Sequence, residues 1–281
     1  MFCLGIDGGG SGCRAVLAAP EGPVLGRGTA GPANIVSDPD GARANLLAAA
    51  EAALAGICVP AETVAVLGVA GANLPEAAAR LARDLPFARV RVVTDLEIAV
   101  AGALGRGDGI LALLGTGSVF ARQRGGRLVR LGGWGPVLGD EGSGGWIGRR
   151  LCARALHAAE GRVPASPYLV ALLGGRGGPE GLVSFARSAT AADFAALVPG
   201  ALAAAEGGDT GAEAVLAAAA AEVAAAIAHL QPASPLPVSF AGGLAEAMAP
   251  RCLAPGWARM QPLGPPLDGA LAMARALAAS G

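Results

Sequence analysis

A short glycine-rich turn holds the first residues of the chain that could do chemistry. Asp7 ends an apolar stretch, and Gly8, Gly9, Gly10 and Ser11 follow it directly. Glycines let backbone N–H groups converge without obstruction from Cβ atoms, which favours an anion-binding nest for phosphate oxygens. Mg²⁺ accompanies phosphates and needs only one or two protein carboxylates, so Asp7 is a candidate magnesium ligand and Ser11 a candidate phosphate contact. The alternative is a plain hairpin turn that Asp7 caps locally.

A second turn later in the chain repeats this arrangement. Gly115, Thr116, Gly117 and Ser118 lie between two apolar stretches and offer backbone amides together with two hydroxyl groups. Alone, this turn is a common hairpin. Paired with the first turn, it predicts a phosphate clamp with two jaws, because positioning and charge neutralisation supply most of the catalysis of phosphoryl transfer.

Asp95 is the candidate catalytic base. It follows the apolar stretch from Val90 to Thr94 and opens a helix, at the carboxyl end of a strand, where ligands of α/β sheets gather. A phosphotransferase acting on a hydroxyl group needs a carboxylate that orients the hydroxyl and accepts its proton. Aspartate is also a preferred N-cap, so a purely structural role for Asp95 as helix cap is the alternative.

Two further glycine-rich stretches give weaker signals. Asp140 and Glu141 are adjacent acids in the long loop 132–145, and they suit bidentate hydrogen bonding to sugar hydroxyls. The alternative is a surface loop whose acids are solvated or lie near a helix N-terminus. Gly242 and Gly243 follow a short apolar strand and would admit a flat group against the backbone.

The composition excludes several kinds of catalysis. The chain has no lysine, so all 21 of its Lys-plus-Arg residues are arginine. This excludes a Walker-A lysine, the strand lysine of protein kinases and Schiff-base chemistry. His157 and His229 lie in alanine-rich helical stretches, which disfavours a Ser-His-Asp triad or a histidine-rich metal site. Five scattered cysteines without a CxxC pair predict reduced core thiols.

Charge and hydropathy indicate the class of partner. The net charge is −1 with acids and bases interspersed, so no nucleic-acid or anionic-membrane surface is expected. The most alanine-rich stretch, from Glu213 to Leu230, is interrupted by Glu222 and His229, and no membrane-spanning segment is expected. The chain begins with a strand and shows no basic leader. We therefore expect a cytoplasmic protein with a small-molecule substrate.

The expected strands and helices form a repeat. A hairpin with a third strand, followed by helix, strand, helix, strand and helix, is predicted twice, once around each glycine-rich turn. The pattern predicts two α/β domains with mixed sheets and a cleft between them, joined at the glycine-rich segment 105–109. Helices are expected over residues 40–55, 75–84, 95–104, 146–159, 210–230 and 268–278, and Thr210 and Glu213 have capping-box spacing.

Taken together, these segments resemble the signature stretches of the actin/hexokinase/Hsp70 superfamily, in the same order. The two phosphate motifs, the first connecting segment, the adenosine motif and the second connecting segment correspond to residues 4–11, 114–118, 94–95, 240–243 and 268–270. The stretch 132–148 is similar to the N-acetylglucosamine and glucosamine kinase branch of the BadF/BadG/BcrA/BcrD ATPase group. The resemblance covers nearly the whole chain apart from residues 161–208.

The resemblance implies a fold and a division of the chain. The fold would consist of two ribonuclease-H-like domains with mixed sheets around a nucleotide cleft. Residues 1–106 would form the N-terminal domain, residues 107–266 the C-terminal domain, and the terminal helix, 267–281, would pack back on the first domain.

The resemblance also implies roles for single residues. Asp95 would be the general base for the sugar 6-hydroxyl, Asp7 would organise Mg²⁺, and the two turns would hold the β- and γ-phosphates of ATP. Gly242 and Gly243 would back the adenosine. The residues expected to line the sugar pocket are Asn34, Gly71, Asp95, Thr116, Asp140 and Glu141.

One position departs from the related enzymes. Animal N-acetylglucosamine kinases follow the second turn with an asparagine that contacts the sugar, and this chain has Val119 there. The choice between N-acetylglucosamine, glucosamine and another amino sugar is therefore left open.

Two other functions are considered. An ATPase that activates a 2-hydroxyacyl-CoA dehydratase needs cluster-ligating cysteines near glycine-rich loops, and Cys152 and Cys252 do not lie in such settings. A nucleotide-binding sensor without catalysis would not need Asp7 and Asp95. The ROK sugar kinases carry a cysteine-rich zinc motif that this chain lacks. Whether the chain forms a homodimer is left open by the sequence.

Overall fold

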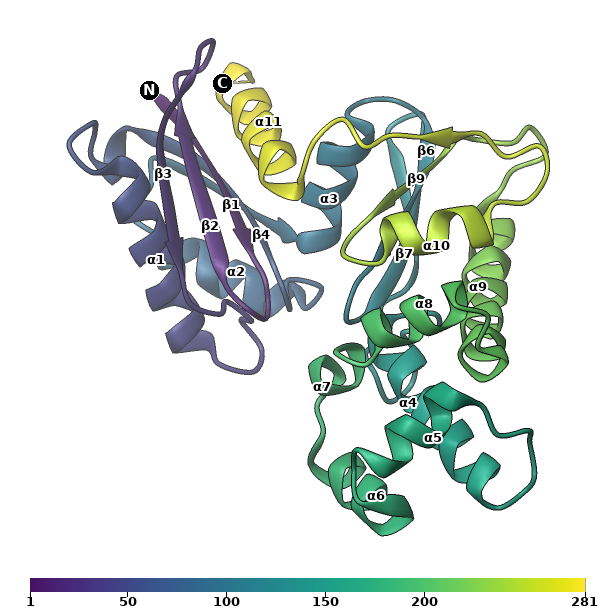
Figure 1. Cartoon of the computed structure of the whole chain (residues 1–281). Helices are drawn as coiled ribbons and strands as arrows, with labels where there is room; N and C mark the ends of the chain where they lie inside the picture. Colours follow the sequence, from purple (N-terminus) through teal and green to yellow (C-terminus); the bar gives the residue numbers. More distant parts are fainter. Residues whose placement is uncertain (281) are drawn as a thin grey trace. The chain divides into compact units, whose positions relative to one another are not determined.

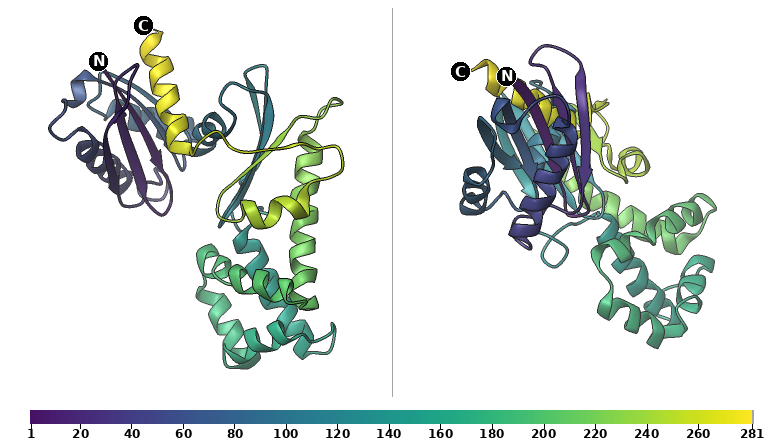
Figure 2. Two further views of the ribbon diagram at one scale, coloured as in Figure 1. Left: turned by 45° about the horizontal axis from the view of Figure 1, so that its top comes forward. Right: turned by 90° about the vertical axis from the view of Figure 1, so that its left-hand side faces the viewer.

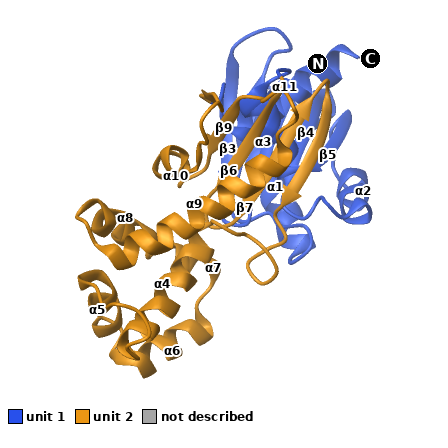
Figure 3. Cartoon of the chain, turned by 90° about the vertical axis from the view of Figure 1, so that its right-hand side faces the viewer, with its two compact units in different colours: residues 1–107, 262–281 blue, residues 108–261 orange. Residues whose placement is uncertain are grey.

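The computed structural model describes residues 1–280, which fold into two compact units (Figure 3). Unit 1 comprises Met1–Gly107 and the C-terminal segment from Pro262, and unit 2 comprises Asp108–Gln261. Each unit contains a five-stranded sheet with both parallel and antiparallel pairs and with helices packed against it. The predicted α/β class with mixed sheets is confirmed.

Unit 1 has the strand order β3-β2-β1-β4-β5. Its strands are β1 (Phe2–Gly8), β2 (Cys13–Ala18), β3 (Val24–Ala30), β4 (Thr63–Val69) and β5 (Arg89–Thr94). Its helices are α1 (Pro39–Leu54), the 3-10 turn η1 (Pro60–Glu62), α2 (Pro75–Arg83), α3 (Asp95–Leu104) and α11 (Pro266–Ala279). The first three strands form an antiparallel meander, and β1, β4 and β5 run parallel.

The two faces of the first sheet bury different helices, because successive strand residues point to opposite sides. Leu4 and Ile6 lie in the core formed with α1. Cys3 and Val16 lie in the core on the other face, formed with α3 and α11. Figure 1 shows α1 and α11 on opposite sides of the sheet.

The close approach of α11 to its neighbours in unit 1 depends on small residues. A Cβ at Gly5 in β1 would lie 2.5 Å from the backbone nitrogen of Leu271. A Cβ at Gly269 would lie 2.0 Å from the carbonyl oxygen of Ile98 in α3. Helix α11 therefore lies directly on β1 and α3, although it is distant from both in the sequence.

Unit 2 repeats the topology of unit 1. Its strands are β6 (Gly109–Leu114), β7 (Ser118–Arg124), β8 (Arg127–Gly132), β9 (Val238–Ala241) and β10 (Arg259–Met260). The order β10-β9-β6-β7-β8 is that of unit 1 read in the opposite direction. The three-strand meander comes first in both units and a parallel strand joins its first member, so the predicted repeat is confirmed at the level of topology.

Six helices stand between the meander and β9 of unit 2. They are α4 (Gly144–Ala159), α5 (Pro167–Gly174), α6 (Gly178–Ser188), α7 (Ala191–Ala195), α8 (Val198–Glu206) and α9 (Thr210–Leu230), and α10 (Ala245–Cys252) follows β9. Figure 2 shows the shorter helices of this series gathered at one end of the unit. They occupy the region that matched no motif, and its predicted helical character is confirmed.

The start of α9 differs from the prediction. Thr210 is the first helical residue, and Asp209 is the N-cap, accepting a hydrogen bond of 2.8 Å from the backbone nitrogen of Ala212. The Asp209 carboxylate also accepts bonds from the Ser166 hydroxyl and the Tyr168 amide. Contacts from α5, far away in the sequence, therefore fix the cap one residue earlier than the capping-box spacing indicated.

Helix α9 bears on the expectation that no segment spans a membrane. By length and composition it is the one described helix long and apolar enough to cross a membrane, because alanine raises its hydropathy despite Glu222. Its buried residues, among them Leu216, Val223 and Ile227, belong to the hydrophobic core of unit 2. This packing is typical of a core helix.

Candidate functional site

The predicted site residues are divided between the two units. Unit 1 holds Asp7, Gly8, Gly9, Gly10, Ser11, Asn34, Gly71 and Asp95, and unit 2 holds Gly115, Thr116, Gly117, Asp140, Glu141, Gly242 and Gly243. In unit 1 these residues lie where the parallel strands β1, β4 and β5 end, the edge at which α/β sheets bind ligands.

The first turn is a closed hairpin. The Gly9 amide donates to the Gly12 carbonyl at 3.0 Å, so this amide is not available to a ligand. Among the described residues of the turn, no glycine has a positive φ, and the expected nest of alternating backbone conformations is not formed. The openness comes instead from missing side chains, because a Cβ at Gly10 would have no atom within 4 Å.

Asp7 lines a pocket of about 270 Å³ beside this turn. The pocket is also lined by the turn residues Gly9 and Ser11 and by Arg14. Burial raises the pKa of the Asp7 carboxyl, the positive charge of Arg14 lowers it, and the negative charge of Asp95 raises it. The carboxylate is thus kept in a place where its charge is disfavoured, which is typical of a group that a cation or a reaction uses.

Asn34 and Gly71 lie side by side next to the first turn. Asn34 forms a parallel bridge with Ala70, and its side-chain oxygen accepts a bond of 3.0 Å from the Val36 amide. Gly71 has a φ of +90°, and a Cβ there would lie 3.1 Å from that same side-chain oxygen. The Ala70 amide donates to the Gly8 carbonyl at 2.8 Å, so the structure brings both predicted sugar-contacting residues to the edge that carries Asp7.

Asp95 is not the cap of α3. Thr94 is the N-cap: its hydroxyl accepts from the Glu97 amide at 3.1 Å, and the Glu97 carboxylate accepts from the Thr94 amide at 2.8 Å. Asp95 is exposed, and one of its carboxylate oxygens accepts a hydrogen bond of 2.9 Å from the Leu96 amide. The structural alternative for Asp95 is therefore wrong, and its second carboxylate oxygen is open to a substrate.

The second turn is braced by the first residues of α4 and by the loop that precedes this helix. Gly144 donates to the Gly115 carbonyl at 2.8 Å, and Gly145 donates to the Thr116 carbonyl at 3.0 Å. The buried Ser118 hydroxyl donates to the Glu141 carbonyl at 2.8 Å, so one of the two hydroxyls expected for a ligand is already used. Thr116 is exposed, so its hydroxyl, unlike that of Ser118, is accessible to a ligand.

Asp140 is the most strained residue of unit 2. It is the one described non-glycine residue with a positive φ, at 60°, and it is buried. Burial raises the pKa of its carboxyl, and amide hydrogen bonds from Ser118 and Gly135 oppose this rise. A Cβ at Gly117 would lie 2.8 Å from the Asp140 carboxylate, which therefore lies directly behind the second turn, whereas Glu141 is exposed. Strain of this kind persists where the surroundings enforce it and is common at functional sites.

Gly242 lets the predicted adenosine segment pack against Leu114, which precedes the second turn. Its φ is +92°, and a Cβ there would lie 2.2 Å from the carbonyl oxygen of Leu114, the residue before Gly115. The Leu114 carbonyl also accepts from the Leu244 amide at 3.0 Å. Gly243, in contrast, has open space where a Cβ would stand, which is what a flat ligand stacked on the backbone requires.

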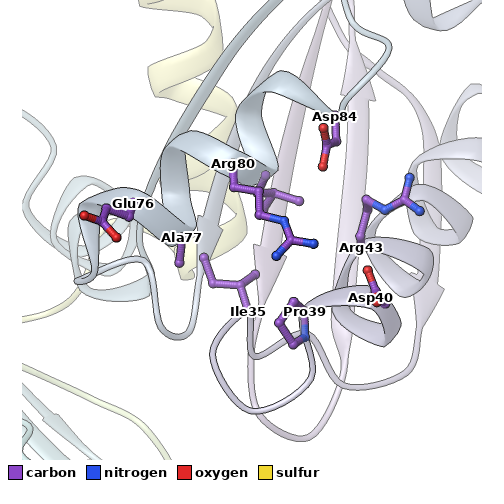
Figure 4. A pocket seen from close by; sticks show the side chains of 9 residues that line it. Ile35, Pro39, Asp40, Arg43, Glu76, Ala77, Arg80 and Asp84 are labelled. Carbon is purple, nitrogen blue, oxygen red and sulfur yellow. The ribbon is translucent and has the colours of Figure 1, made fainter.

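A separate pocket lies in unit 1 between α1 and α2 (Figure 4). It has a volume of about 250 Å³ and is lined by charged residues of both signs, among them Asp40, Arg80 and Asp84. None of the residues predicted for the site lines it, although its wall includes Ile35, the neighbour of Asn34.

Comparison of the sequence with known protein families identifies the family of this chain. Residues 4–252 match the model of the BadF/BadG/BcrA/BcrD ATPase family. The chain belongs to this family. The membership stated above as a resemblance is confirmed.

Two curated members of similar sequence are sugar kinases. Over 171 residues the chain is 33% identical to an N-acetylmuramic acid/N-acetylglucosamine kinase of Clostridium acetobutylicum, covering 57% of this chain and 55% of that protein. It is also 33% identical over 171 residues to a glucosamine kinase of Vibrio cholerae, covering 59% of this chain and 58% of that protein. The chain thus matches little more than half the length of either relative.

Solved structures extend the likeness to the whole chain. A crystal structure from Chromobacterium violaceum, assigned as an N-acetylglucosamine kinase, is 34% identical and covers 97% of this chain and 98% of that chain with a TM-score of 0.87. A ROK glucokinase from Streptomyces griseus, in complex with glucose and AMPPNP, is 20% identical, covers 100% of both chains and has a TM-score of 0.59. At that identity it shows the fold alone, which is the actin-like ATPase fold expected from the sequence.

The donor groups suit Mg-ATP. Within residues 1–280 no three His, Cys, Asp or Glu side chains cluster as a metal site, so Asp7 with its open surroundings suits an ion that keeps most of its water ligands, as Mg²⁺ does. Open space beside Gly10, Gly115 and Gly243 would admit phosphate and adenine against the backbone.

Sequence reasoning missed the roles of three residues at this site. Arg14 is opposite Asp7 in the strand register of the hairpin, and a register drawn from the four-residue turn would have shown it. Thr94 and Glu97 carry the T-x-x-E spacing of a capping box, which would have removed the cap role from Asp95.

Proposed function

We propose that the chain is an ATP-dependent kinase that transfers the γ-phosphoryl group of ATP to the 6-hydroxyl of N-acetylglucosamine or glucosamine. One observation carries this proposal. Asp7 lies near the carboxyl end of β1 and the exposed Asp95 directly follows β5, at the same edge of the parallel strands, and Thr94 caps α3 in place of Asp95. The pair supplies the two carboxylates that phosphoryl transfer to an alcohol needs, one for the metal and one for the proton.

The relatives support the same class of acceptor. The sugar kinases of similar sequence act on amino sugars by name, and the structure assigned as an N-acetylglucosamine kinase matches this chain along nearly its whole length. Val119 is half-buried in β7 and pairs with Gly132, so it offers an acetamido group no hydrogen bond from its side chain. The proposal therefore includes free glucosamine as an acceptor.

In the proposed reaction, Asp95 accepts the proton of the sugar 6-hydroxyl while the oxygen forms a bond to the γ-phosphorus. The bond between that phosphorus and the bridging oxygen breaks, and ADP leaves with the electron pair. Asn34 and the loop at Gly71 lie at the same sheet edge and would orient the sugar. When Mg²⁺ is bound at Asp7, it neutralises charge on the phosphate oxygens.

Unit 2 would bind the remainder of the nucleotide and part of the sugar. The exposed Thr116 hydroxyl is open to a phosphate oxygen or the sugar, and Gly242 and Gly243 would back the adenosine. Asp140 is buried behind the turn, so we assign it to the support of Gly117, and the exposed Glu141 is the better candidate for a sugar hydroxyl.

The dehydratase-activator alternative is disfavoured by the cysteines. Cys152 and Cys252 are buried, and burial raises the pKa of the Cys252 thiol to about 12. A thiol that stays protonated is a poor cluster ligand, because metals bind the thiolate.

The proposal is tested by ADP release in a coupled assay with Mg-ATP and with N-acetylglucosamine, glucosamine, N-acetylmuramic acid or glucose. We expect turnover that requires an acceptor and is strongest with N-acetylglucosamine or glucosamine. ADP release at the same rate without any sugar would overturn the kinase proposal and favour an ATPase. Turnover with glucose alone would overturn the choice of acceptor and leave the kinase.

A further inference from the structure

A kinase without lysine needs another cation to neutralise the negative charge of the phosphoryl group that is transferred. Lysine and arginine are the side chains that neutralise phosphate, and this chain has arginine alone. Among the described residues lining the pocket beside the first turn, Arg14 is the one cation. Arg14 also lowers the pKa of Asp7.

Strand register places Arg14 beside Asp7. The two residues are direct partners in the antiparallel β1–β2 pair, so their side chains share a face of the sheet. Val16, two residues after Arg14, lies in the core formed with α3 and α11, whereas Cys13 and Ala15 lie in the opposite core. Alternation along the strand therefore puts Arg14 on the face from which α3 begins with Asp95.

Arg14 forms no ion pair with any of the described residues. The ion pairs of the described residues within 4.0 Å involve Arg162, Arg251 and Arg259, and not Arg14. Its side chain is exposed and forms no hydrogen bond to any of residues 1–280. Arg14 still acts on Asp7 at longer range, since its charge opposes the rise of the Asp7 pKa. A guanidinium near a carboxylate, but not paired with it, can take a second anion.

We propose that Arg14 binds the terminal phosphate oxygens of the nucleotide and supplies there the positive charge that a lysine would otherwise bring. Its planar guanidinium can donate two parallel hydrogen bonds to one phosphate. The open backbone at Gly10 leaves room for the phosphate next to it. This inference rests on the proposed kinase function, because it assumes that the nucleotide occupies the first turn.

The test is calorimetric binding of a non-hydrolysable ATP analogue with Mg²⁺, and of AMP, to the full chain. The variants are Arg14→Gln, Arg14→Lys and the control Arg83→Ala, an exposed arginine at the end of α2. A hydrogen bond to a charged group contributes about 1.5–3 kcal/mol, so Arg14→Gln should weaken analogue binding about 10- to 100-fold. AMP binding should stay within about twofold, and Arg14→Lys should lie between Arg14→Gln and the wild type.

The outcomes separate this inference from the function on which it rests. Equal analogue affinity for Arg14→Gln and the wild type would overturn the role of Arg14 and leave the kinase untouched. Equal loss of AMP and analogue binding would also overturn it, because it would indicate general damage to the turn. A wild-type protein that binds no analogue would overturn the proposed function itself.

Discussion

The two glycine-rich turns lie at equivalent places in sheets of the same strand order, yet they are built differently. The first turn closes on itself through Gly9 and Gly12 and has charged residues, Asp7 and Arg14, on the strands beside it. The second is braced from outside, through bonds to the carbonyls of Gly115 and Thr116 and through the buried Ser118 hydroxyl. Sheets of one topology therefore carry different turns: charged residues flank the first, whereas backbone bonds and a buried hydroxyl brace the second.

The largest effect is expected from removing the base of unit 1. Asp95→Asn keeps the oxygen that accepts the Leu96 amide but cannot take a proton, so turnover should fall by about 10²- to 10⁴-fold with sugar affinity unchanged. Steady-state kinetics and sugar binding measure both quantities. Asp84→Asn, an exposed acid next to α2, is the control. Turnover retained in Asp95→Asn would remove this residue from the mechanism.

The next effect concerns the architecture of unit 2, and neighbouring glycines provide a matched pair. Gly242→Ala combines a positive φ with a Cβ 2.2 Å from the Leu114 carbonyl oxygen, so it should lower the free energy of unfolding by about 2 kcal/mol or more. Gly243→Ala meets no atom within 4 Å and should leave stability unchanged while weakening adenosine binding. Thermal and denaturant unfolding would show the difference. Equal stability of both variants would contradict the account of this segment.

A smaller effect tests whether the charge of Asp7 lowers the stability of the fold. Burial raises the pKa of Asp7 in the folded state, so stability is greatest below the unfolded pKa and is lost as the pH rises through the folded pKa. Above its folded pKa, ionised Asp7 therefore destabilises the fold. Asp7→Asn should retain or raise the melting temperature and abolish Mg-dependent turnover. A clear loss of stability together with normal turnover would contradict the assignment.

The smallest predicted effect is a shift in pH dependence. The negative charge of Asp95 raises the pKa of Asp7, so Asp95→Asn should lower it. The acidic midpoint of Mg-dependent nucleotide binding should therefore move to lower pH in Asp95→Asn, and Arg14→Gln should move it to higher pH. Calorimetry over a pH series measures the midpoint. Identical midpoints in all three proteins would show that these charges do not interact in solution.

The sequence was sufficient where local patterns decide the structure. Apolar stretches on either side of glycine-rich turns predicted both hairpins, and repetition of this pattern predicted two sheets of one topology. The same T-x-x-E spacing occurs at Thr94 and at Thr210, however, and forms a capping box only at Thr94. At α9, Asp209 takes the cap because it also accepts bonds from Ser166 and Tyr168.

What the sequence did not reveal depends on contacts between distant segments. The bond from the Ser118 hydroxyl to the Glu141 carbonyl and the placement of Asp140 behind Gly117 depend on how the loop before α4 folds back. No local pattern in the sequence encodes the positive φ of Asp140. The supporting role that we propose for Asp140, in place of the predicted sugar contact, therefore depends on knowing the structure.

The central claim, transfer of a phosphoryl group from ATP to the 6-hydroxyl of an amino sugar with Asp95 as base, is tested most directly by phosphorus NMR of the product. The account predicts a single phosphate monoester coupled to the two C6 protons after incubation of the wild type with Mg-ATP and N-acetylglucosamine or glucosamine, and none with Asp95→Asn. A phosphate on another carbon, inorganic phosphate as the sole product, or an unchanged yield with Asp95→Asn would contradict it.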